Sequence, residues 1–172
     1  ITNINASITG EVILATTGGE IIDNDTTDDN DITAHYLFIM ATEGIGRTNS
    51  IETTVTYLDV YNDGIGDVNI SNTGTLALMS SPYVPDGLSV YSGGGDVNIS
   101  TASTILIADP IETNGGDLSL TATTGISQNA YIFTGDGGSG AGDYTADAGT
   151  GVYTMTSTSW IDTTDTGGDG DV

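Results

Sequence analysis

The chain has 172 residues, enough for one domain with a sizeable core, and its formal charge of −23 comes from 24 Asp and Glu against one Lys or Arg, Arg47. One base cannot form the cationic surface that nucleic-acid binding needs, and with no Cys and one His the chain has no disulfide, thiolate metal site or poly-histidine site. No apolar run reaches the length of a membrane-spanning helix, and the excess of β-branched residues, Gly and Asp predicts an all-β protein.

The first 65 residues show no regular repeat, but their pattern predicts several strands. Residues 1–15 predict two short strands, residues 35–41 a buried apolar strand, and residues 51–61 an alternating strand. Residues 16–33 contain the acidic text DNDTTDDND and predict a loop. The Pro-containing residues 80–87 predict an excursion from a later coil.

Two groups of aspartates are candidate calcium ligands, because dense carboxylates repel one another unless a cation or water lies between them. The first group lies in the acidic loop and comprises Asp23, Asp25, Asp28, Asp29 and Asp31. The second lies near Gly167 and Gly168 and comprises Asp162, Asp165, Asp169 and Asp171. Neither spacing matches an EF-hand or the calcium-binding nonapeptide, so solvated acidic loops are the alternative interpretation.

A repeat begins at residue 66. Gly-Asp opens four segments at residues 66–67, 95–96, 116–117 and 142–143, and each is followed by alternating apolar residues. One residue after the Asp stands Val68, Val97, Leu118 or Tyr144. Three residues after it stands Ile70, Ile99, Leu120 or Ala146, and nine residues after it stands Leu76, Ile105, Ile126 or Val152.

A unit of 20–30 residues cannot bury its own apolar face, so such units must stack. The sequence therefore predicts one domain, residues 1–172, folded as a parallel β-helix (β-solenoid), irregular over 1–65 and regular over 66–172. Six or seven coils would give roughly 30 Å of axial length at about 4.8 Å per coil. An antiparallel β-sandwich is the alternative fold with the same composition.

The last residues, Gly170, Asp171 and Val172, read as the start of another repeat. Continuing the count at residue 1 places Ile8 at the nine-residue position, with Ile1 and Ile4 beside the first strand. The chain is therefore expected to be one period of a longer tandem array or a protomer that stacks end to end. The self-assembly residues would be Ile1, Ile4, Ile8 and Val172. The alternative is that Val172 precedes a disordered tail.

The sequence of residues 95–138 resembles the repeats of filamentous-haemagglutinin-like adhesins and related large bacterial surface exoproteins. Both have Gly-Asp-Val/Leu, an alternating strand, Gly-Ile and a polar corner in this order. The resemblance covers about residues 66–156. It implies a right-handed parallel β-helix, secretion and a role at the cell surface, and it supplies no catalytic residues.

Other candidate sites are sparse. Asn5, Asn24, Asn69 and Asn98 each begin an N-x-S/T sequon, which in a Thr- and Asn-rich chain also arises by chance. Paired carboxylates could belong to a polysaccharide-active enzyme, but His35 and Arg47 are the only imidazole and base available. Trp160 and the tyrosines are candidates for glycan stacking, or for positions at the end of the core.

We therefore expect a non-catalytic subunit of a secreted extracellular fibre or adhesin stalk, whose main partner is itself, with a glycan or cell-surface receptor as a further partner and Ca²⁺ as the one candidate cofactor. The alternatives are a calcium-dependent, pilin-like β-sandwich subunit joined by strand donation, and a polysaccharide-active β-helix enzyme.

Overall fold

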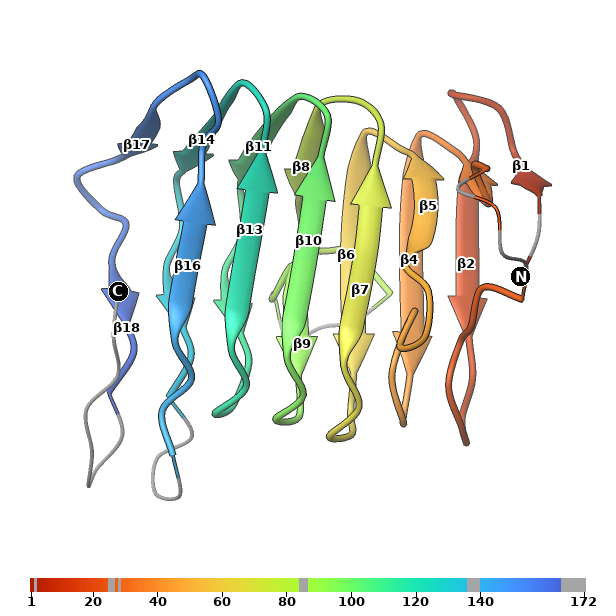
Figure 1. Ribbon diagram of the computed structural model, residues 1–172, viewed down its shortest axis with the longest axis horizontal. Coiled ribbons are helices and arrows are strands. Elements are labelled where there is room, and N and C mark those ends of the chain that lie inside the picture. The colour runs from red at the N-terminus through yellow and green to blue at the C-terminus, as the bar shows by residue number, and fades with distance from the viewer. Residues whose placement is uncertain (2, 25–26, 28, 84–86, 136–139, 165–172) are drawn as a thin grey trace.

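The protein is a β-solenoid, seen side-on in the computed structural model (Figure 1), which describes residues 1, 3–24, 27, 29–83, 87–135 and 140–164. Every pairing between named strands is parallel, so the antiparallel sandwich predicted as an alternative is wrong. Among the described residues no helix is long and apolar enough to cross a membrane.

One face of the solenoid is a seven-stranded sheet with one strand from each coil. Seven strands make six steps from the first coil to the last, in agreement with the predicted number of coils. The strands, in spatial order, are β1 (Ile4–Asn5), β3 (Ile32–Thr33), β5 (Ile51–Thr54), β7 (Val68–Asn72), β10 (Val97–Thr101), β13 (Leu118–Ala122) and β16 (Tyr144–Asp147).

The other two faces share an eleven-stranded sheet, because two long strands in the early coils, β4 and β6, run across both faces. Strands along the second face are β2 (Glu11–Ala15), β4 (Tyr36–Ala41), β6 (Tyr57–Asn62), β8 (Leu76–Leu78), β11 (Thr104–Ile107), β14 (Gly125–Gln128) and β17 (Tyr153–Met155). Strands along the third face are β9 (Val90–Ser92), β12 (Ile111–Glu112), β15 (Ile132–Phe133) and β18 (Ile161–Asp162).

The apolar residues aligned in the sequence form columns in the core. Val68, Val97, Leu118 and Tyr144 pair in register along the first face, and all four are buried. Alternation on the pleated strands directs these side chains inward and their polar neighbours outward. The stacked coils that the repeat predicted are thus confirmed.

The column predicted nine residues after the Asp is correct only as far as Ile126. Tyr153, not Val152, pairs with Ile126, and Val152 is 68% exposed. The corner before β17 contains one residue more than the preceding corners, and Gly149 turns it with a φ of 57°. The strand predicted over residues 51–61 is also divided, because the chain turns a corner between β5 and β6.

The Gly-Asp motif builds one corner of each of the four regular coils, and both of its residues have a structural reason. A Cβ on Gly95 would lie 2.2 Å from the carbonyl oxygen of Gly66 in the coil before it, so the coils approach too closely for any side chain. The carboxylate of Asp96 accepts the N–H of Asp117 in the next coil at 3.0 Å. The same two contacts recur along the row of Gly66–Gly95–Gly116–Gly142 and Asp67–Asp96–Asp117–Asp143.

Each Gly-Asp corner is also fastened from inside. Ser92 is fully buried and donates its hydroxyl to the carbonyl of Gly95 at 2.7 Å. Asn62, Thr113 and Thr134 donate to the equivalent Gly carbonyl in their own corners. A buried carbonyl without a partner is costly, so these side chains hold the corner closed.

Candidate functional site

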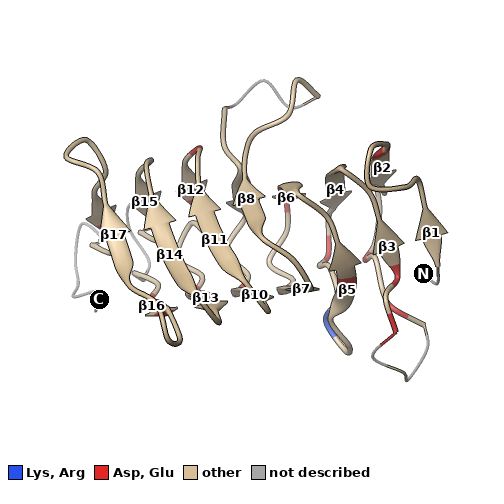
Figure 2. Ribbon diagram, turned by 90° about the horizontal axis from the view of Figure 1, so that it is seen from above, with Lys and Arg blue, Asp and Glu red and all other residues tan. Residues whose placement is uncertain are grey.

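The acidic loop delivers two of its predicted metal ligands to one place. Asp23 and Asp31 are 5% and 2% exposed, and their carboxylates lie together with that of Glu52, all three ligand atoms within 4.8 Å of one another. We call these three residues the carboxylate cluster; Figure 2 shows acidic residues gathered around β3 and β5. Asp29 is exposed, and Asp25 and Asp28 lie outside the described residues.

The strand register explains why Glu52 joins the cluster. Ile32 pairs with Thr53, so Asp31 stands beside Glu52 on the neighbouring strand. The N–H of Asp31 donates to the carbonyl of Glu52 at 2.9 Å, and the N–H of Glu52 donates to the carboxylate of Asp31 at 3.3 Å. The sequence indicates that Glu52 lies on the polar side of an alternating strand. It does not indicate the strand pairing that brings Glu52 next to Asp31.

The cluster has hydrogen-bond donors close by but no described basic side chain. Asn49 donates its amide to the carboxylate of Asp23. Arg47, the single Lys or Arg of the chain, instead forms an ion pair with Glu20 at 3.6 Å near the surface. Three carboxylates this close repel one another unless a proton or a cation lies between them, and carboxylate oxygens are the ligands that Ca²⁺ prefers.

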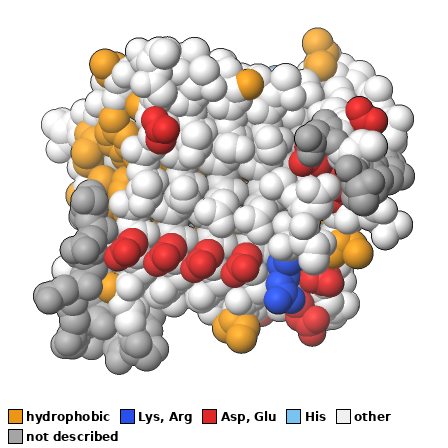
Figure 3. Space-filling model, in the orientation of Figure 1, with side chains coloured by type: hydrophobic (Ala, Val, Ile, Leu, Met, Phe, Trp, Pro, Cys, Tyr) orange, Lys and Arg blue, Asp and Glu red, His pale blue; other side chains and the backbone are white. Residues whose placement is uncertain are grey.

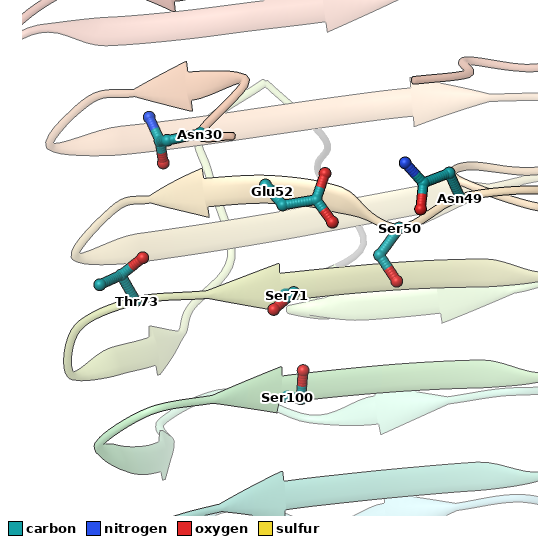
Figure 4. Close-up of a pocket in the computed structure, with 7 residues that line it drawn as sticks. All are labelled: Asn30, Asn49, Ser50, Glu52, Ser71, Thr73 and Ser100. Atoms are coloured by element: carbon teal, nitrogen blue, oxygen red, sulfur yellow. The ribbon is translucent and has the colours of Figure 1, made fainter. Parts of the chain in front are cut away.

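A polar hollow of about 430 Å³ opens on the first face directly beside the cluster (Figure 4). Glu52 belongs to both, and Asn49, which lines the hollow, donates to Asp23 of the cluster, so the hollow and the cluster are continuous. A second hollow of about 180 Å³ shares Ser50 and Ser100 with it and extends as far as β13. We call the two hollows the polar trough; the larger is lined by Asn30, Asn49, Ser50, Glu52, Ser71, Thr73 and Ser100.

The chemistry of the trough is that of hydroxyl and amide groups. Ser71 and Ser100 project from successive strands in Figure 4, and the described residues give their hydroxyls no side-chain hydrogen bond. The larger hollow has one carboxylate, from Glu52, and no base. Such a surface can exchange hydrogen bonds with an uncharged polyol.

Of the second predicted aspartate group, Asp162 is the one member among the described residues, and it is far along the chain from the carboxylate cluster. Asp162 lies in β18, in the last described coil, and its carboxylate accepts the hydroxyl and the N–H of Thr164 at 2.6 and 3.0 Å. These bonds lower the pKa of Asp162 below its ordinary value of 3.8. Asp165, Asp169, Asp171 and Val172 lie outside the described residues.

A row of acidic side chains crosses the first face (Figure 3), formed by the aspartates of the Gly-Asp corners. Asn69 and Asn98, two of the predicted glycosylation sites, form a similar row. The side-chain amide of Asn98 donates to Oδ1 of Asn69, and the side-chain amide of Asn69 donates to the backbone carbonyl of Gly46. A glycan on either nitrogen would take one of its two N–H hydrogens and would have to fit beside these bonds. Asn5 and Asn24 are exposed.

The aromatic residues stack along the axis of the solenoid. The rings of Tyr61 and Tyr91 are 4.8 Å apart, as are those of Tyr131 and Trp160. In these two pairs the ring faces are turned toward each other, which leaves mainly ring edges for a glycan on the sides. His35 is exposed and lies edge-on to Tyr57 rather than inside the core.

The predicted self-assembly residues are divided between packed and exposed positions. Ile1 and Ile4 are partly buried and pack against the hydrophobic core, whereas Ile8 is 68% exposed and precedes β2. Comparison with family models, with curated proteins and with solved structures finds no match to this chain.

Proposed function

We propose that the chain is a non-catalytic structural subunit of a secreted extracellular fibre or adhesin stalk, built from β-solenoid coils that stack end to end. The observation that carries this proposal is the pair of sheet edges at the two ends. Among the described strands, β1 and β2 have no neighbour on one side, and neither do β16, β17 and β18. A free parallel edge offers unpaired backbone groups to another strand.

The surface chemistry supports a structural role over catalysis. Asp23 and Asp31 are buried, and the one guanidinium is occupied by Glu20, so the cluster offers a substrate little access and no basic partner. The polysaccharide-active alternative predicts turnover of neutral or acidic glycans. We expect none, and measurable turnover that is lost in Glu52→Gln would favour the enzyme.

Calcium is the second part of the proposal. A divalent cation at the carboxylate cluster would join the loop before β3 to β5 and would offset the repulsion of three buried or half-buried carboxylates. Ca²⁺ at 100 times its dissociation constant would stabilise the fold by about 2.7 kcal/mol. We expect Ca²⁺ to raise the melting temperature of the wild type and of Asp63→Asn, whose carboxylate is exposed elsewhere, but not of Glu52→Gln. Equal shifts in all three proteins would contradict the site.

A second candidate function is attachment to an uncharged glycan at the polar trough. The outward hydroxyls of Ser71 and Ser100 favour a polyol, whereas Glu52 and the aspartate row disfavour an anionic one. Binding to neutral rather than sulfated or uronic glycans, abolished by Ser100→Tyr, is the expected result. Retained binding in that variant would place the contact elsewhere.

Electron microscopy of the purified chain tests the fibre directly. We expect unbranched filaments at physiological salt and millimolar Ca²⁺, because both reduce repulsion between copies that each carry a charge of −23. Dispersed monomers at every calcium and salt concentration would contradict the proposal.

A further inference from the structure

The last described coil leaves the core open. An apolar hollow of about 340 Å³ is lined by Tyr144, Ala146, Tyr153, Met155 and Ile161. Met155 is 46% exposed, although it continues a register column in which Leu78 and Ile107 are fully buried. The side chain of Met155 thus lies on the inward side of its strand, and no coil covers it among the described residues.

The first coil is open in the same way. Ile13 of β2 is 50% exposed and Leu14 is half-buried, whereas Ile39, the register partner of Leu14 in the next coil, is fully buried. Among the described strands, those of this coil pair only with strands of the coil that follows.

The register columns connect these two ends. The column of Val12 runs through Leu37 and Leu58 and ends on Met155. Two inward columns begin and end on apolar residues: Val12 with Met155, by way of the buried Gln128, and Leu14 with Ile161.

An outward column gives the same result. Ile13 pairs with Phe38, and Phe38 pairs with Asp59. The outward position of Asp59 comes one residue before the paired column of Val60, Val90, Ile111, Ile132 and Ile161, and in the last coil that position is Trp160, which is 47% exposed. One face of the Trp160 ring lies on Tyr131, with planes 9° apart, and no described strand follows on the side of its other face. Trp160 and Ile13 are thus two large exposed apolar residues at opposite ends of one column.

We infer that a second copy of this chain adds in register, its β1 and β2 continuing the sheets of β16, β17 and β18. Met155 then lies under Val12, Ile161 under Leu14, and Trp160 under Ile13 of the added copy. This inference rests on the proposed fibre and specifies its contact.

We assign a second copy of this chain to the open end because the contact would continue the one already made between successive coils. Each coil in the solenoid offers parallel backbone bonds and an apolar column to the next. The first coil supplies both to the last coil, at the same positions.

Cysteine pairs test the register, because the chain has no native cysteine. Within one copy, residues 13 and 160 are six coil steps, about 29 Å, apart, which no disulfide can span. Between stacked copies they would be about 4.8 Å apart, within disulfide reach. We expect Ile13→Cys with Trp160→Cys to form a ladder of covalent dimers, trimers and longer chains on a non-reducing gel under mild oxidation.

The matched control moves one thiol two residues along the same outward face. Ala15→Cys with Trp160→Cys puts the thiols' Cα atoms about 8 Å apart, beyond disulfide reach, and should give mainly monomer. Unchanged far-ultraviolet circular dichroism shows that each variant is folded. Filaments with no ladder, or equal ladders from both pairs, overturn the register while leaving the fibre intact; the absence of filaments overturns both proposals.

A charge substitution gives an independent readout. We expect Met155→Asp to shorten the filaments or abolish them, because it places a carboxylate in the apolar contact. Ile65→Asp, at a site that is 85% exposed and away from both ends, should leave them unchanged. Equal filament lengths in the two variants would contradict an apolar contact at Met155.

Discussion

Replacing Gly95 with Ala tests the corner that defines the repeat. The added Cβ would lie 2.2 Å from the carbonyl oxygen of Gly66 and 2.9 Å from that of Ile65. An ordinary contact between carbon and oxygen is about 3.3 Å, so one coil must move by roughly 1 Å relative to the next. Overpacking of this kind costs about 3 kcal/mol.

Thermal unfolding measures the effect. For a domain of this size 3 kcal/mol corresponds to a fall in melting temperature of roughly 6–12 °C. Gly74→Ala is the matched control, because a Cβ at Gly74 meets nothing within 4 Å. It should leave stability unchanged or raise it by about 0.5 kcal/mol. A Gly95→Ala protein as stable as the wild type would refute the close approach of the coils.

Three further predictions concern the polar groups that hold the coils. Asp96→Ala removes the acceptor for the N–H of Asp117 and should lower the free energy of unfolding by about 1 kcal/mol in a denaturant titration. Asp96→Asn keeps an acceptor oxygen and relieves the repulsion between stacked aspartates, so it should cost less. Equal losses of stability in the two variants would contradict the ladder of aspartates. Ser92→Ala should cost about 1–3 kcal/mol, because the buried carbonyl of Gly95 loses its donor, and Ser92→Thr should restore stability, since Thr113 has the same role in the next corner. Burial raises the pKa of Tyr144 and Tyr153 above the ordinary 10.0, so their contribution to stability is complete below pH 10 and is lost as the pH rises further. The free energy of unfolding of Tyr144→Phe should therefore fall less steeply above pH 10 than that of the wild type. An equal fall in the two proteins would count against burial as the cause.

The repeats could be predicted because the positions of their motif have fixed structural roles. Gly95 is required by close approach, Asp96 by the ladder, and Val97 by the core, so the three appear together in each regular coil. The third face was not predicted, since β12 and β15 have only two residues each and no alternation can be seen in so short a strand.

The candidate site was predicted only in part, for a different reason. The density of aspartates identified Asp23 and Asp31, but Glu52 joins them through the pairing of Ile32 with Thr53, in irregular coils whose register no repeat fixes. The position of Val152 was misjudged because one added residue in a corner leaves the local alternation unchanged while it shifts the column.

The most direct test of the central claim is diffraction from oriented filaments. Stacked parallel coils continued in register from copy to copy predict a meridional reflection at about 4.8 Å and an axial repeat of about 34 Å, seven coils per copy. A 4.8 Å reflection on the equator, or an axial repeat that is not a whole number of coils, would contradict end-to-end stacking of the solenoid.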